Sequence, residues 1–97
     1  MAGYIILVNL TSEGITSVKE APERIRQGKA AAEKMGIRTV GVWATLGQYD
    51  LMVVADAPDD KSVAAFALSM ASAAKATTQT MRAFSEDELA QIVSALP

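Results

Sequence analysis

The chain has 97 residues, of which 51% are apolar and 21% charged, a composition typical of one globular domain and unlike that of disordered or fibrous chains. Nine basic and eleven acidic residues leave a net charge of −2, which argues against binding to the phosphate backbone of nucleic acids. Histidine and cysteine are absent, so disulfides, thiolate nucleophiles, imidazole bases and most zinc, haem or iron–sulfur sites are excluded.

The sequence also bears on location and partners. Its first residues lack the cationic stretch and long apolar segment of an export signal. No apolar run approaches the ~20 residues that cross a membrane. We therefore expect a cytoplasmic protein that forms one domain over residues 1–97, with no membrane partner, no metal and no cofactor.

The first expected strand covers residues 3–11. It is apolar at consecutive positions from Ile5 to Val8, which predicts a strand buried on both faces. Asn9 interrupts this pattern on the face of Ile5 and Leu7, and a buried amide needs hydrogen-bond partners or water. Asn9 therefore indicates either a hydrated or liganded cavity or a hydrogen bond within an interface.

A helical pattern follows, with Thr11 or Ser12 as its N-cap and apolar residues at helical spacing over residues 15–35. Pro22 disfavours helical backbone at the residue before it. Either the early turns form a separate short piece or the main helix begins near Glu20, and we favour the second interpretation.

A hairpin is expected next, because residues 37–46 and 49–55 are two strand-like runs separated by Gly47-Gln48, the Gly-X pair of a two-residue type II′ turn. Counting outward from that turn assigns each residue to a face. The apolar face is expected to hold the pairs Leu46/Tyr49, Ala44/Leu51, Val42/Val53 and Val40/Ala55. The second face, polar at its ends, is expected to hold Thr45/Asp50, Trp43/Met52, Gly41/Val54 and Thr39/Asp56. Tyr49 is expected to pack in the core with its hydroxyl at the rim.

Two further helices and a strand complete the chain. Asp59-Asp60 is an acidic N-cap for a second helix. A Thr-rich final strand covers residues 77–84, and Ser85 with Glu88 then forms a capping box for a short C-terminal helix. The apolar stripe of the second helix is Val63, Phe66, Ala67, Met70 and Ala74, and that of the C-terminal helix is Leu89, Ile92, Val93 and Leu96.

This order predicts an α+β fold, a ferredoxin-like βαββαβ sandwich whose four-stranded antiparallel sheet has the spatial order four-one-three-two. Ile6, Val8, Val40, Val42 and Val53 are expected under the helices. Two helices cover only one face, yet the first strand and the hairpin carry apolar residues on the other face too. A second copy is the expected cover, giving a face-to-face homodimer or a higher homo-oligomer.

Several ordered motifs resemble those of the GYD domain family over nearly the whole chain. They are Tyr4-Ile5, Thr11-x-x-Gly14-Ile15, Lys19-Glu20-x-Pro22-x-Arg24, Thr45-Leu46-Gly47-Gln48-Tyr49-Asp50, Ala57-Pro58-Asp59-Asp60 and Thr78-x-Thr80-x-Arg82-Ala83-Phe84-Ser85. The resemblance implies a single GYD-type domain of the dimeric α/β barrel group, and the members of the GYD family have no settled biochemical function. Trp43 departs from the tyrosine expected nearby, so no role is carried over to it.

Five residues are predicted to converge on one partly enclosed pocket beside the second face: Asn9, Trp43, Thr45, Asp50 and Arg82. Asp50 is either a general base or ligand anchor, or a residue that caps the turn or pairs with Arg82. Arg82 offers a fork for a carboxylate ligand or an ion pair. Trp43 either stacks on a planar ligand or fills the dimer interface.

The preferred functional hypothesis is a homo-oligomeric module that binds a small molecule or a protein partner at or near the cavity between two sheets. The alternative is a cofactor-independent enzyme, an isomerase or a monooxygenase-like protein of the dimeric α/β barrel group, which would use Asp50 and Arg82. A purely structural dimer is a third possibility. The sequence alone leaves open whether the protein is an enzyme.

Overall fold

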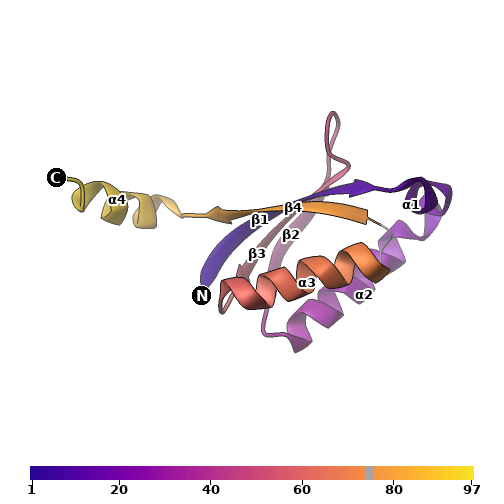
Figure 1. Ribbon diagram of the computed structural model, residues 1–97, viewed down its shortest axis with the longest axis horizontal. Helices are drawn as coiled ribbons and strands as arrows, with labels where there is room; N and C mark the ends of the chain where they lie inside the picture. The colour runs from indigo at the N-terminus through magenta and orange to yellow at the C-terminus, as the bar shows by residue number, and fades with distance from the viewer. Residues whose placement is uncertain (74–75) are drawn as a thin grey trace.

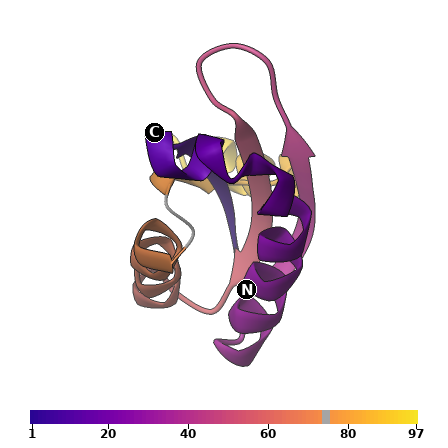
Figure 2. The same cartoon turned by 90° about the vertical axis from the view of Figure 1, so that its right-hand side faces the viewer.

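A four-stranded antiparallel sheet with two long helices on one of its faces forms the body of the protein (Figures 1 and 2). The computed structural model describes residues 1–73 and 76–97. The strands are β1 (Ala2–Leu10), β2 (Arg38–Ala44), β3 (Leu51–Ala57) and β4 (Ala76–Ala83), in the spatial order β2-β3-β1-β4. The helices are α1 (Ser12–Thr16), α2 (Ala21–Lys34), α3 (Asp60–Ala73) and α4 (Glu86–Ser94), with a 3₁₀ turn, η1 (Val18–Glu20). The predicted ferredoxin-like fold and strand order are confirmed.

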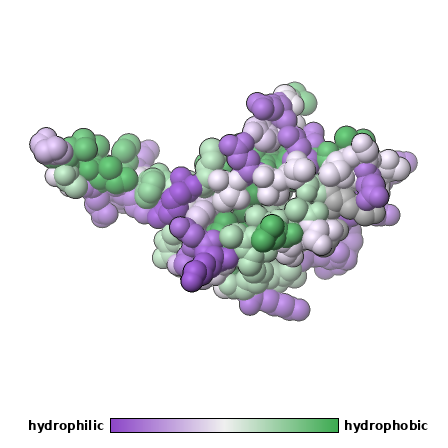
Figure 3. All heavy atoms as spheres, viewed as in Figure 1, coloured by the Kyte–Doolittle hydropathy of each residue, from purple (hydrophilic) through white to green (hydrophobic). Residues whose placement is uncertain are grey.

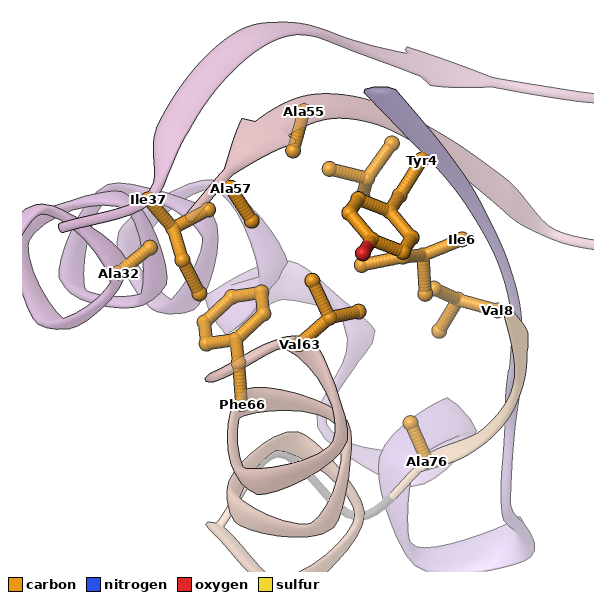
Figure 4. Close-up of a cluster of buried hydrophobic side chains, with 11 residues drawn as sticks. Tyr4, Ile6, Val8, Ala32, Ile37, Ala55, Ala57, Val63, Phe66 and Ala76 are labelled. Carbon is orange, nitrogen blue, oxygen red and sulfur yellow. The ribbon is translucent and has the colours of Figure 1, made fainter. Parts of the chain in front are cut away.

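The core lies between the sheet and the two long helices. Alternate residues of β1 and β3 point toward the helices, as the period of a strand requires. Ile6, Val8 and Val53 are buried there as predicted, and Val42 packs against the edge of the cluster. The buried residues are Tyr4, Ile6, Val8, Ala32, Ile37, Val53, Ala55, Ala57, Val63, Phe66 and Ala76 (Figure 4).

The hairpin register is confirmed at four positions and wrong at two. The confirmed pairs are Gly41 with Val54, Val42 with Val53, Trp43 with Met52 and Ala44 with Leu51. Beyond Gly41 a β-bulge shifts the register by one residue, so Ala55 pairs with Thr39 and Asp56 pairs with Arg38. The predicted burial of Val40 is wrong, because the bulge turns this residue out of the ladder and leaves it 54% exposed.

The expected two-residue turn at Gly47-Gln48 is also wrong. The ladder ends at Ala44 and Leu51, and the last backbone hydrogen bond runs from Thr45 N–H to Asp50 O at 2.9 Å. Leu46 and Tyr49 therefore belong to a wider loop. The physical reason lies in β1: the N–H of Asp50 donates to Val8 O at 2.9 Å, which draws this end of the hairpin toward β1.

After β1 the structure has both a separate short helical piece and a main helix that begins next to Glu20, so each of the two alternatives raised by Pro22 is partly correct. The main helix α2 begins at Ala21 with Pro22 in its first turn, where the missing N–H costs no helical hydrogen bond. The earlier residues form the separate short helix α1 and the turn η1. Thr11 Oγ1 caps α1 by accepting from Gly14 N–H at 3.3 Å.

Helix α3 presents the predicted stripe to the sheet. Asp59 caps it by accepting from the backbone N–H and the hydroxyl of Ser62, both at 2.8 Å, and these hydrogen bonds lower the pKa of Asp59. Val63 and Phe66 are buried against the core. Ala74, the last residue of the predicted stripe, lies outside the described residues.

Helix α4 projects from the body like an arm, away from α2 and α3 (Figure 1). The predicted capping box is confirmed, since Glu88 N–H donates to Ser85 Oγ at 3.2 Å and Ser85 N–H donates to Glu88 Oε1 at 3.0 Å. No residue of α4 is buried. Within residues 1–73 and 76–97, every helix is too short or too polar to cross a membrane.

Candidate functional site

The face of the sheet opposite α2 and α3 is apolar over its centre, and at one end the hydroxyl of Tyr49 from the hairpin loop reaches Gln79, the partner of Leu7. We call it the open face and define it by six side chains: Ile5, Leu7, Trp43, Met52, Val54 and Met81. The strand registers place these residues together, because Ile5 pairs with Val54 and Met81 while Leu7 pairs with Met52. All six are half-buried or exposed, with Trp43 at 49% and Met81 at 40%.

Trp43 lies on the open face opposite Met52, as predicted, and folds back over Gly41. A Cβ placed at Gly41 would lie 2.4 Å from the indole ring. The missing side chain of Gly41 therefore provides the space in which the indole packs flat against the strand.

We expect Gly41→Ala to push the Trp43 indole off the sheet, because the new methyl group needs the space that the ring occupies. Trp43 is the sole tryptophan of the chain, so its fluorescence reports this displacement directly. A red shift of the emission maximum and faster quenching by iodide are the expected results. Gly28→Ala is the control for a change of glycine to alanine, because a Cβ at Gly28 meets no atom within 4 Å, and an emission spectrum unchanged by Gly41→Ala would contradict the packing described.

Asp50 and Thr45 form hydrogen bonds that hold the hairpin loop. Asp50 Oδ2 accepts from Leu10 N–H at 2.8 Å, and Thr45 Oγ1 donates to Tyr49 O at 2.5 Å. The local role considered for Asp50 is thus present, although it caps the end of β1 and not the turn itself. The Tyr49 hydroxyl reaches Gln79 on β4.

Arg82 belongs to β4 and lies on the helix-covered face of the sheet, beside the first residues of β1. It pairs with Tyr4, and its guanidinium lies 5.5 Å from the centroid of the Tyr4 ring and 4.4 Å from that of Phe84. It donates to Gly3 O at 3.1 Å and forms an ion pair with Glu88 at 3.6 Å. Arg82 therefore links the sheet to the beginning of α4.

The predicted convergence of five residues is wrong for Arg82. Asp50 bonds to Leu10 at one end of β1, whereas Arg82 bonds to Gly3 at the other end, roughly 20 Å away for an extended strand. The predicted ion pair between Asp50 and Arg82 is absent for the same reason.

The other four candidates share one end of the sheet. Asn9 of β1 pairs with Thr77 of β4 on one side. On its other side the strand register continues to Asp50 and then to Thr45, and Trp43 lies two residues along the chain from Thr45. Their predicted role in ligand binding stays a prediction.

The Tyr4 hydroxyl is a polar group at the margin of the otherwise apolar core. It donates to the carboxylate of Asp60 at the start of α3, and this hydrogen bond, followed by burial, raises the pKa of Tyr4. A tyrosine with a raised pKa stays protonated at neutral pH, so it acts as a tether between β1 and α3 and not as a base.

A cavity lies on the helix-covered face, in a cleft between α2 and α3. It has a volume of about 260 Å³. Its floor includes Leu10 of β1, and its walls include Ile25 and Gly28 of α2 and Phe66 and Met70 of α3. Figure 2 shows the two helices standing apart over the sheet. We call this feature the α2–α3 cleft.

The α2–α3 cleft is apolar with a cationic rim. Among its described lining residues the charged side chains are those of Arg24 and Lys29. Arg24 is held in place by hydrogen bonds to Ser17 Oγ at 2.8 Å and to Glu20 Oε2 at 2.9 Å. This cleft was not predicted from the sequence, in which its one signal is Gly28, a glycine inside a helix where alanine would be more stable.

We expect Gly28→Ala to raise the free energy of unfolding by about 0.5–1 kcal/mol, because a Cβ there meets no atom within 4 Å and alanine is the better helix former. Urea denaturation measures the change. Gly36→Ala is the matched control and should destabilise, since Gly36 has φ +78°. A loss of stability in Gly28→Ala would show that the cleft is narrower than described.

Comparison with known proteins gives two matches. A model described as the GYD domain matches residues 4–93. A protein of Thermus thermophilus, "Glutamine synthetase and cystathionine beta-lyase binding protein", is 36% identical over 84 residues, which cover 86% of this chain and 88% of that protein. No solved structure matches the chain.

Proposed function

The chain belongs to the GYD domain family, and on that premise we propose that it is a protein-binding module that works as a homodimer. The similarity to the Thermus thermophilus protein supports this role, because that relative carries the name of a protein that binds two enzymes. Glutamine synthetase and cystathionine β-lyase are therefore the first partners to test.

The open face is the observation that carries the proposal. Scattered exposed apolar residues are normal on soluble proteins, but six of them contiguous on one sheet mark an interaction surface. We propose that a second copy covers this face, since a twofold axis lets the same patch pair with itself. Trp43 then fills the interface.

The dimer would also enclose the end of the sheet that holds Asn9, Thr45 and Asp50. We propose this space between the two sheets as the place for a small ligand, with the Asn9 amide and the Asp50 carboxylate as its polar groups. The alternative of a cofactor-independent enzyme needs Asp50 and Arg82 to act together. These two residues lie at opposite ends of β1 within one chain, so we do not propose it.

Two measurements on the purified full chain test the proposal. Sedimentation at micromolar concentration should report a dimer or a larger species, and a clean monomer would overturn the homodimer. Purified glutamine synthetase and cystathionine β-lyase, each immobilised on a sensor surface, should retain the chain with saturable affinity in the micromolar range or better. An unrelated immobilised enzyme is the control, and failure to bind either enzyme would overturn the assignment of these partners.

A further inference from the structure

We propose that α4 of one copy docks into the α2–α3 cleft of a second copy. Among residues 1–73 and 76–97, none covers the apolar side of α4 and none fills the apolar α2–α3 cleft, and neither feature takes part in the proposed contact between open faces. The inference therefore goes beyond the proposed function and does not depend on it.

The C-terminal segment that contains α4 has the properties of a docking element. Its apolar residues Leu89, Ile92, Val93 and Leu96 follow helical spacing and are 43–66% exposed. Figure 3 shows hydrophobic residues gathered on the projecting arm. An isolated helix of nine residues is marginal in water, and packing of an apolar face supplies most helical stability in proteins. The conformation of α4 thus calls for a partner surface.

The α2–α3 cleft matches this helix in shape and polarity. An amphipathic helix binds by laying its apolar face in a hydrophobic groove. The cleft offers such a groove, because Gly28 contributes no side chain and a Cβ there would meet no atom within 4 Å. Its volume of about 260 Å³ suits a few aliphatic side chains more than a whole ligand of drug size.

Charge complementarity identifies the occupant. The cleft rim carries Lys29, together with Arg24, whose charge is already paired with that of Glu20. Residues 85–97 carry Glu86, Asp87 and Glu88 and no basic residue. Glu88 is engaged by Ser85 and Arg82, so Glu86 and Asp87 are the carboxylates available to the rim.

A chain cannot place α4 in its own cleft. Helix α4 follows Ala83, which pairs with Gly3, whereas the floor of the cleft is formed by Val8 and Leu10. These positions are separated by roughly 20 Å of extended strand, and α4 points away from the cleft (Figure 1). The α4 that fills the cleft must therefore come from a second copy.

Complementation between two damaged chains tests the contact. Gly28→Trp fills the cleft, with Gly28→Ala as its matched control. Ile92→Glu places a charge on the apolar side of α4, with Gln91→Glu adding the same charge on the exposed polar side. Sedimentation velocity of the full chains measures association, and circular dichroism checks that each variant is folded. Every chain in this experiment also carries Met52→Lys, which disrupts the proposed open-face dimer, so that any remaining association reports the contact between α4 and the cleft.

In this background each of the variants Gly28→Trp and Ile92→Glu should weaken self-association by about tenfold or more, whereas both controls should associate as the parent does. A mixture of the two damaged chains should associate again, because it contains one intact α4 and one open cleft. Lys29→Glu, which leaves the core untouched, should also weaken association, and Lys34→Glu is its control. A parent that stays monomeric, or a mixture that fails to associate, would overturn the inference.

The outcomes also separate this inference from the proposed function. If the open-face dimer is wrong, the unmodified chain should still associate in a way that depends on Ile92 and Gly28 and not on Met52. Association that survives Gly28→Trp but not Ile92→Glu would show that α4 pairs with another α4, which contradicts the inference.

Discussion

Replacing Ile6 by alanine is expected to lower the free energy of unfolding by about 3–5 kcal/mol, the upper part of the range for large-to-small changes in a core. Ile6 is 1% exposed and lies beneath the helices in the centre of the sheet, where its neighbours cannot collapse into the space that it leaves. Because domains of this size are stable by about 5–15 kcal/mol, the loss is a large fraction of the total. Urea denaturation at low protein concentration measures it.

Ile5→Ala is the matched control for Ile6→Ala. The two isoleucines are neighbours on β1, but Ile5 points to the open face and is only partly buried in a single chain. We expect a loss well below that of Ile6→Ala at low concentration, growing with protein concentration if a second copy covers the face. Equal losses for both variants at low concentration would contradict the assignment of the two faces.

In chains that carry Ile92→Glu, which removes the proposed contact through α4, Met52→Lys is expected to convert the open-face dimer to a monomer, with a dissociation constant at least about 100-fold higher. Met52 lies in the middle of the open face, between Trp43 and Leu7, so a second copy would bury the new ammonium group without a partner charge. The single chain should stay folded because Met52 is half-exposed in it.

Sedimentation of Met52→Lys in these Ile92→Glu chains over a range of concentrations measures the change, and the melting temperature should become independent of concentration. Gln48→Lys adds the same charge in the exposed hairpin loop and should leave the dimer intact. A double variant Met52→Lys/Ile92→Glu that sediments as the single variant Ile92→Glu does would show that the remaining contact between copies does not use the open face.

Much of the fold could be predicted because hydrophobic periodicity reports which face of an element is buried. The faces of β2 and β3 follow from alternation between Val42 and Val53 on one side and Trp43 and Met52 on the other. The bulge could not be predicted from this pattern. Val40 and Val42 are both apolar, so the regular and the bulged register each bury a valine; the bulged register places Arg38 opposite Asp56, with which it forms an ion pair.

The site was harder to predict than the fold, because it depends on registers and spacings between distant segments. The alternation of β4 is weak, with threonines on both faces, so the sequence did not reveal that Arg82 points to the helices. The α2–α3 cleft depends on how far apart two helices lie on the sheet, and no local sequence pattern encodes that separation. Gly28 alone hints at it.

The bulge at Val40 has a consequence for the behaviour of the protein at high concentration. Strand β2 forms one border of the sheet, and a regular border strand offers unpaired backbone groups on which further chains can add without limit. The extra residue breaks the regular spacing of those groups and increases the local twist, so an incoming strand cannot pair along the whole border. Deleting Val40 would remove this protection, and a variant without it should form fibrillar aggregates at concentrations where the natural sequence stays dispersed.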